Sequence, residues 1–234
     1  MKYNIVSIDD SRKEYKETIR ARVKLKEVPI PAVDGKAVDL QAELDKRELF
    51  LEGYHPTRGE LGVWLSTFDC WQWARDNDEE LVVFEDDAIP TAQFNQFLEE
   101  FRSELPVNWG FLTLWVPENQ YYDYLYDLEY DSTGGWQKVG NDRTGFTSIF
   151  NYGAIRLSKV YQGYGNVATL YSPMGASRLI NHARTNGISN PIDCWIMDRA
   201  HTGVIDGYSP KPHWAKAVRY DWAAETTVHN TERL

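Results

Sequence analysis

The ten residues "LVVFEDDAIP" (81–90) decide the fold class of this chain. The run "LVVF" (81–84) is entirely apolar, which is typical of a strand buried on both faces of a sheet. Three carboxylates follow it at once: Glu85, Asp86 and Asp87. Neighbouring negative charges repel each other unless a cation lies among them. The stretch therefore predicts a central strand with a cation-binding site at its carboxyl end.

Strands and helices are predicted to alternate around this stretch. The other predicted strands are 3–8, 28–33, 111–115, 153–157, 167–172 and 203–208. The predicted helices are 11–25, 38–52, 57–74, 94–101, 173–187 and 193–200, with a Thr57-x-x-Glu60 capping box and Ser172 before Pro173 as start signals. This order predicts an α/β fold, a single domain with a mostly parallel central sheet flanked by helices.

The alternation lapses between residues 117 and 150, where the chain is aromatic and acidic without a clear period. Long irregular excursions in a compact domain are usually functional. This segment has two interpretations. It is either a lid or platform for the acceptor, or an ordinary surface loop. The aromatic side chains in question are Tyr121, Tyr122, Tyr124, Tyr126 and Trp136.

Composition favours a soluble enzyme-sized domain. The chain has 234 residues, 42% of them hydrophobic, and no apolar run long enough to span a membrane. The start "MKYNIVSIDD" lacks a secretory apolar region, so a cytoplasmic location is expected. Cys70 and Cys194 are too few for a disulfide framework and are expected to be buried, inert thiols.

Charge and aromatic content limit the partners. A net charge of −10 disfavours a protein that coats nucleic acid. Residues 11–27 are locally basic. This predicts a solvated helix face on which charges pair at i,i+4, and the alternative is a single basic surface that binds a partner. The chain has 9 Trp and 14 Tyr, a large number for its length. Such a surplus often lines a site for flat or sugar-like ligands, and the alternative is that a large core contains these side chains.

The spacing of the carboxylates suits a divalent metal. On an extended chain Glu85 and Asp87 point to one side and Asp86 to the other. Hard oxygen ligands of this kind suit Mg²⁺ or Mn²⁺, which commonly serve phosphate groups. The competing interpretation is a helix cap or a solvated loop.

Several segments together resemble glycosyltransferase family 25, which includes lipopolysaccharide-type sugar transferases and collagen galactosyltransferases. The matching segments are "PAVDG" (31–35), "GELGVWLSTFDCWQWA" (59–74), "LVVFEDDA" (81–88), "ATLYSPMGASRLI" (168–180), "NPIDCWI" (190–196), "KPHW" (211–214) and "AAETTV" (223–228). There are departures from the family pattern. The family's Ser-His pair reads Ser66-Thr67, the N-L-x-R after the first strand reads "DDSRKEY" (9–15), and residues 117–166 match poorly.

The resemblance implies a GT-A fold, with a nucleotide-sugar-binding half at about 1–116 and an acceptor-binding half at about 117–234. It implies a UDP-sugar donor and a Mn²⁺ or Mg²⁺ ion held by Glu85, Asp87 and His213. The donor itself is expected at Ser7, Asp9, Asp34, Gly35, Arg58, Gly59 and Asp86. A tight turn, a helix cap and packing glycines are the structural alternatives for several of these residues.

Members of this kind invert the anomeric carbon, which requires a base for the acceptor hydroxyl. The resemblance places Asp193 in that role, and N-capping of the following helix is the alternative. The expected acceptor is a glycan or a protein, with a hydroxymethylated DNA base as a further possibility. Two other functions stay open: a metal-dependent nucleotidyltransferase or phosphodiesterase, and a nucleotide-sugar binder without turnover.

Overall fold

A computed structural model of the chain describes residues 1–8, 12–115, 166–210 and 217–220, together with three further strands by their backbone alone. One sheet of seven strands has the order β2-β1-β3-β9-β5-β10-β8, and two small sheets pair β11 with β4 and β6 with β7. The strands are β1 (Lys2–Val6), β2 (Lys26–Glu27), β3 (Leu81–Glu85), β4 (Ala88–Pro90), β5 (Phe111–Thr113), β6 (Leu128–Tyr130), β7 (Trp136–Lys138), β8 (Leu157–Val160), β9 (Ala168–Tyr171), β10 (Gly207–Pro210) and β11 (Val218–Tyr220).

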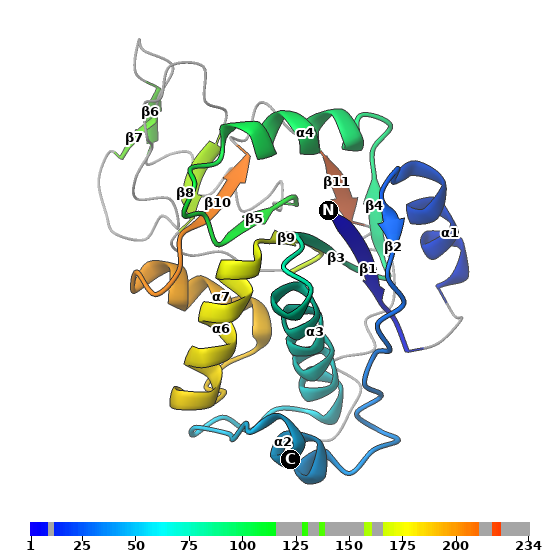
Figure 1. Ribbon diagram of the computed structural model, residues 1–234, viewed down its shortest axis with the longest axis vertical. Helices are drawn as coiled ribbons and strands as arrows, with labels where there is room; N and C mark the ends of the chain where they lie inside the picture. Colours follow the sequence, from blue (N-terminus) through cyan, green and yellow to red (C-terminus); the bar gives the residue numbers. More distant parts are fainter. Residues whose placement is uncertain are drawn as a thin grey trace.

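Helices cover both faces of the large sheet (Figure 1). The described helices are α1 (Lys13–Arg22), α2 (Leu40–Arg47), α3 (Arg58–Asp76), α4 (Phe94–Glu104), α6 (Pro173–Asn186) and α7 (Ile192–His201). One core cluster joins α2, α3, α6 and α7 to one face of the sheet. A second cluster joins α1 and α4 to the other face. The mixed α/β architecture with a flanked central sheet is therefore as predicted.

Strand β3 lies in the middle of this arrangement. Leu81 and Val83 belong to the core cluster on the α3 side, and Val82 and Phe84 belong to the cluster on the α4 side. All four side chains are buried. The apolar run was therefore a correct signal for a strand buried on both faces, because such a strand meets hydrophobic neighbours whichever way a side chain points.

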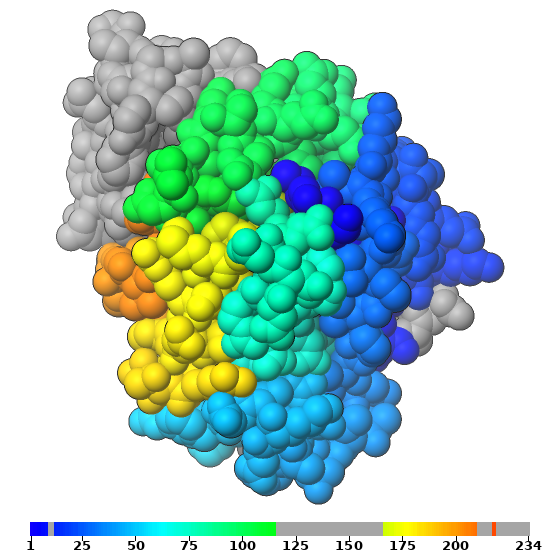
Figure 2. Space-filling view, in the orientation of Figure 1, coloured from blue at the N-terminus to red at the C-terminus, as the bar shows by residue number. Residues whose placement is uncertain are grey.

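Helix α3 starts and packs as its sequence predicts. The Thr57 hydroxyl accepts a hydrogen bond from the Glu60 amide at 3.1 Å, and the Glu60 carboxylate accepts one from the Thr57 amide at 2.6 Å. Helices α3 and α6 lie side by side (Figure 2). Between α3 and α7, the ring of Trp64 packs edge-on against Trp195 with centroids 5.2 Å apart. These tryptophans belong to the core.

The prediction of a mostly parallel sheet is only half right. Strands β1 and β2, β1 and β3, and β5 and β10 pair in parallel. Strand β9 lies antiparallel between β3 and β5, and β8 is antiparallel to β10. All four residues of β9 are buried, so its hydrophobicity resembles that of a parallel strand. Hydrophobic pattern reports burial and carries no information about strand direction.

Two strand predictions are displaced among the fully described residues, and the strand predicted at 153–157 shares only Leu157 with β8, its other residues lying outside the described ones. Residues 28–33 are not a strand, since Pro29 and Pro31 cannot donate ladder hydrogen bonds, and the short β2 precedes them. The amide of Ile30 instead donates to the Asn4 side chain at 3.1 Å. The strand predicted at 203–208 starts only at Gly207. The amide of Val204 is still bonded to the carbonyl of Arg199 at 2.9 Å, which closes α7.

Both cysteines are free thiols, and Cys70 is buried as predicted, whereas Cys194 is only half-buried. Burial raises the pKa of each thiol to about 12. Within the described parts of the chain, every helix is too short or too polar to cross a bilayer. The aromatic stretch from Tyr121 to Trp136 is described only as strand backbone at β6 and β7, so its proposed role as a lid or platform stays a prediction.

Candidate active site

The carboxyl ends of β1 and β3 lie next to each other, because the strands are parallel and Val6 pairs in register with Glu85. Ser7 and the acidic cluster (Glu85, Asp86 and Asp87) therefore follow the two strands at one edge of the sheet, where open α/β sheets bind ligands. A pocket of about 150 Å³ lies there. Its polar lining comprises Ser7, Arg12, Asp34, Lys36, Ser66 and the acidic cluster, and its apolar lining comprises Val6, Ile8, Val33 and Val63.

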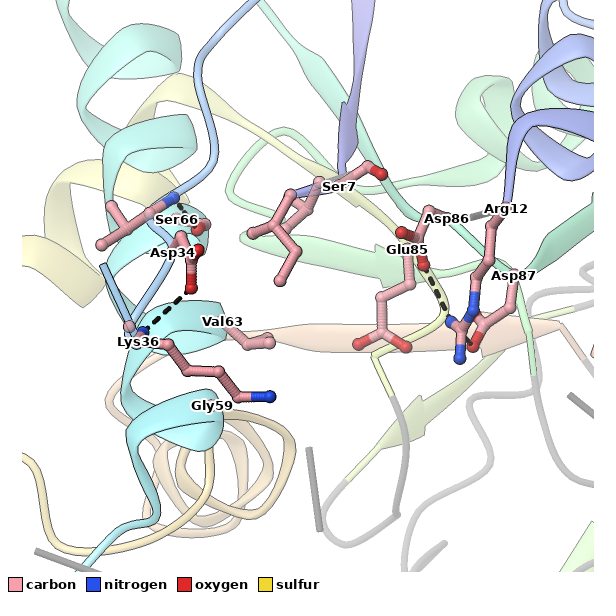
Figure 3. A pocket seen from close by; sticks show the side chains of 14 residues that line it. Ser7, Arg12, Asp34, Lys36, Gly59, Val63, Ser66, Glu85, Asp86 and Asp87 are labelled. Carbon is pink, nitrogen blue, oxygen red and sulfur yellow. Dashed lines mark hydrogen bonds and ion pairs between the residues drawn. The ribbon is translucent and has the colours of Figure 1, made fainter. Parts of the chain in front are cut away.

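The guanidinium of Arg12 lies among the carboxylates (Figure 3). Its Nη1 donates to Oδ1 of Asp86 at 2.8 Å and to Oδ2 of Asp87 at 2.5 Å. The side chains of Arg12, Asp86 and Asp87 are only 13%, 17% and 7% exposed. The sequence predicted a cation at this position and assigned it to a metal. In this structure Arg12, from the segment interpreted as a solvated helix face, supplies that positive charge.

One cation does not satisfy the cluster. Oδ1 of Asp87 is buried and has no hydrogen-bond partner within the described chain. Burial and the charge of Asp86 raise the pKa of Asp87, and the charge of Arg12 opposes them. A buried carboxylate oxygen without a partner is unfavourable, and such an oxygen is a suitable ligand for Mg²⁺ or Mn²⁺. Asp87 therefore fits the predicted role of metal ligand.

Glu85 is the most perturbed member of the cluster. Burial raises its pKa to about 8, and the charges of Asp87, Asp193 and Asp86 add to the shift while Arg12 opposes it. Perturbed carboxyl groups of this kind are frequent in functional sites. The involvement of Asp193 is informative, because it lies more than a hundred residues away in sequence. The charge of the predicted base therefore acts on the acidic cluster, although Asp193 is not part of the described pocket lining.

A tight turn forms the opposite wall of the pocket. The side chain of Asp34 accepts a hydrogen bond from the backbone amide of Lys36 at 2.9 Å. The Lys36 side chain reaches across the pocket in the direction of Glu85 (Figure 3). The turn alternative for Asp34 and Gly35 is thus correct, and the same turn also faces the pocket. The turn and the donor-binding role of Asp34 and Gly35 are compatible, because the turn places both residues at the pocket.

The turn is held against α3 by glycines. A Cβ on Gly35 would lie 1.9 Å from the carbonyl oxygen of Arg58, so no other residue fits there. The hydroxyl of Ser66 accepts from the amide of Val33 at 2.8 Å and donates to the carbonyl of Gly62 at 2.7 Å. The packing alternative is therefore correct for Gly62, while Gly59 lines the pocket. The motif glycines place the turn at the site.

The structure does not bring every predicted residue to the pocket. The guanidinium of Arg58 donates to the carbonyl of Val38 at 2.8 Å, and Arg58 is not part of the described pocket lining. Asp9 and His213 lie outside the described residues, so their assigned roles stay predictions. Apart from these, no three His, Cys, Asp or Glu side chains in the described ranges are grouped as a ready metal site.

Asp193 lies in the first turn of α7. The helix is preceded by Pro191, which stands at the N-cap position without a side-chain bond, so the N-cap alternative for Asp193 is wrong. Oδ1 of Asp193 accepts a hydrogen bond from the amide of Cys194 at 2.8 Å. A helix N-terminus stabilises a negative charge. The Asp193 carboxylate therefore lies at the end of α7 where the backbone dipole is positive.

Two site residues were missed from sequence, Arg12 and Lys36. Arg12 precedes a helix rich in basic residues that are mostly exposed, including Lys13, which pairs with Glu17 at 3.8 Å. Nothing in the local pattern distinguishes Arg12 from those neighbours, because its partners lie 74 and 75 residues away. Lys36 carried a weak signal, since it directly follows the Asp34-Gly35 turn of the "PAVDG" motif.

Comparisons with known proteins agree with these motifs. The family described as glycosyltransferase family 25 (LPS biosynthesis protein) matches residues 1–194. No curated protein matches the chain. Among solved structures, mouse xyloside xylosyltransferase 1 in its apo form is similar at 12% identity, over 87% of this chain and 69% of that one, with a TM-score of 0.34.

Proposed function

Because the chain belongs to glycosyltransferase family 25, we propose that it moves a sugar from a UDP-sugar to an acceptor hydroxyl with inversion of the anomeric carbon. The observation that carries the proposal is Asp87, which lines a pocket at the carboxyl ends of β1 and β3 and has a buried, unpartnered Oδ1. That edge of an α/β sheet is where nucleotides bind.

The two kinds of lining match the two parts of a nucleotide. Val33 and Val63 offer an apolar surface to a flat base, and Ile8, which is 48% exposed, lies in the same pocket. Ser7 and Asp34 are hydrogen-bonding groups suited to base or ribose. Lys36 contributes positive charge for the diphosphate.

We further propose that the reaction requires Mn²⁺ or Mg²⁺. Glu85 and Asp87 would hold the ion, with His213 as the third ligand that the family resemblance suggests. Such an ion neutralises the negative charge that develops on a departing diphosphate. Carboxylate and imidazole ligands suit Mn²⁺, and carboxylates suit Mg²⁺.

Asp193 is the proposed base. Its carboxylate takes the proton of the acceptor hydroxyl while the acceptor oxygen forms a bond to the anomeric carbon. The bond between that carbon and the diphosphate oxygen breaks, and its electron pair leaves with UDP. The charge of Asp193 raises the pKa of Glu85, and this supports the assignment, because Glu85 belongs to the acidic cluster that lines the pocket.

For the acceptor we propose a hydroxyl of a glycan or a protein, which is compatible with the net charge of −10. A hydroxymethylated base in DNA is the alternative, for which the basic face of α1 would provide contacts. The two are separated by measuring DNA affinity at several salt concentrations. Binding to DNA that falls steeply with salt would favour the second acceptor.

Calorimetric titration with UDP and a panel of UDP-hexoses, with and without Mn²⁺, tests the donor and metal assignments. We expect Mn²⁺ to strengthen UDP binding by about tenfold or more, because the ion offsets the repulsion between the diphosphate and the carboxylates. The variant Asp87→Asn should lose this dependence on the metal. When an acceptor hydroxyl is supplied, or more slowly when water takes its place, the sugar should leave the preferred UDP-hexose and UDP should be released.

Asp45→Asn is the matched control, because Asp45 is an exposed carboxylate on α2 away from the pocket. Thermal unfolding of both variants checks that they are folded. The metal assignment is wrong if wild-type protein binds UDP equally well without Mn²⁺ and Asp87→Asn changes nothing. Donor binding without UDP release, either to water or to a panel of glycan and protein acceptors, would identify a binder in place of an enzyme.

A further inference from the structure

Arg12 has an unusual position for a residue at the start of a helix. It stands at the N-cap of α1 with φ of −108° and ψ of 34°, and no side chain caps the helix there. A guanidinium does not stabilise the positive end of a helix. The position of Arg12 is therefore explained by its long-range partners Asp86 and Asp87, and its side chain lines the pocket.

The contact uses one nitrogen for two carboxylates. Nη1 lies between Oδ1 of Asp86 and Oδ2 of Asp87, so it occupies space next to the carboxylates that a cation ligand would also approach. An ion pair with this little exposure contributes little net stability, because desolvation of the charges offsets their attraction. Removing Arg12 alone, however, leaves two adjacent negative charges without their shared partner. The pair is thus suited to an exchange of partners.

From this geometry we infer that Arg12 is an internal counter-ion that exchanges partners during donor binding. In the donor-free protein it neutralises Asp86 and Asp87; when a divalent cation takes its place, its guanidinium binds the diphosphate of the donor. The inference rests on the proposed function. No covalent bond changes in this step: Asp87 passes from the guanidinium to the metal that it would hold with Glu85, Asp86 is released from its ion pair, and the guanidinium passes from carboxylates to phosphate oxygens, which it binds equally well.

The inference makes opposite predictions for the two ligands. Arg12→Ala should bind Mn²⁺ alone more tightly than wild type, by about tenfold, because the ion no longer competes with an internal cation. The same variant should bind UDP more weakly at saturating Mn²⁺, again by about tenfold, because a phosphate ligand is lost. Titration calorimetry measures UDP binding, and the electron paramagnetic resonance signal of free Mn²⁺ measures metal binding.

Two further variants make the result interpretable. Arg20→Ala is the matched control, since Arg20 lies on the same helix and pairs with Glu27 at 2.9 Å, and we expect both affinities to be unchanged. Arg12→Lys retains the charge and should fall between wild type and Arg12→Ala in both titrations. It also replaces Arg12→Ala in the test if that variant fails to fold.

The outcomes separate this inference from the proposed function. If wild-type protein binds UDP with the help of Mn²⁺ but the Arg12 variants have unchanged affinities for both ligands, only the counter-ion inference is overturned. Weaker Mn²⁺ binding in Arg12→Ala would also overturn it, because Arg12 would then only organise the carboxylates. Absence of Mn²⁺ binding in wild type and variants overturns both proposals.

Discussion

The backbone of Gly62 in α3 packs directly against that of Gly35 in the pocket turn. A Cβ on Gly62 would lie 2.9 Å from the amide nitrogen of Gly35 and 2.7 Å from the carbonyl oxygen of Val33. Both close atoms belong to the backbone, so no side-chain rotation can relieve the contact. The turn that carries Asp34 and Lys36 therefore owes its place to the absence of a side chain on α3.

We expect Gly62→Ala to destabilise the protein by about 1–3 kcal/mol, the usual cost of forcing an extra methyl group into a packed region. The displaced turn should also weaken UDP binding. Gly53→Ala is the control, because a Cβ on Gly53 would have no atom within 4 Å and so would cause no clash. Gly53 has φ of 65°, which an alanine adopts only with strain. Its strain should cost about 1–2 kcal/mol without changing UDP affinity. Equal UDP affinity in the two variants would contradict the coupling of this contact to the site.

Replacement of Asp193 by Asn tests the base. The amide cannot accept the acceptor proton, so turnover should fall by about 10²–10⁴-fold while UDP affinity at saturating Mn²⁺ stays near the wild-type value. Asp198→Asn on the same helix is the control, since Asp198 accepts a hydrogen bond from Asn190 at 2.7 Å and, unlike Asp193, is not among the charges that shift the pKa of Glu85. Wild-type turnover in Asp193→Asn would exclude Asp193 as the base.

Arg47 is a buried charge outside the site. Its side chain binds both oxygens of Asp69, at 2.7 and 2.6 Å, and also the Glu43 carboxylate. We expect Arg47→Met to lower the free energy of unfolding by about 3–5 kcal/mol, because Asp69 loses its partner in a poorly hydrated place. Urea unfolding measures the change, and Arg75→Met, whose partner Asp76 is exposed, is the control. A loss under about 1 kcal/mol would show that water replaces the guanidinium there.

The Glu27 carboxylate provides a pH-dependent contribution to stability. The hydrogen bond from Arg20 is the main reason why its pKa lies below the ordinary value of 4.5. A lowered carboxyl pKa stabilises the fold above the unfolded pKa, and this contribution is lost as pH falls below 4.5 through the folded value. Glu27→Gln should therefore be less stable than wild type near pH 7, by at most about 1 kcal/mol at this exposure, and equal to it in strong acid.

Urea unfolding of wild type and Glu27→Gln between pH 2 and 7 is the measurement. Glu17→Gln is the control, because the Glu17 carboxylate is more exposed and its contact with Lys13 is longer, at 3.8 Å. A stability difference for Glu27→Gln that persists undiminished at the acid end would contradict the role of the ionised carboxylate.

The local sequence determined the elements whose causes are local. The reciprocal bonds of Thr57 and Glu60 start α3, and Ser172 before Pro173 starts α6, as predicted, since capping depends on residues within one turn. The buried character of β3 followed from its composition. The motif segments likewise led to the family that matches residues 1–194.

Only the tertiary structure decided the direction of β9, the action of the Asp193 charge on the pKa of Glu85, and the identity of the cation beside Asp86 and Asp87. Each of these joins residues far apart in the chain, and hydrophobic period or charge spacing reports only a residue's own burial and near neighbours. The sequence by itself indicated that a positive charge belongs next to the carboxylates. That Arg12 supplies it depends on how α1 packs beside β4, the strand that follows the carboxylates, which no local pattern records.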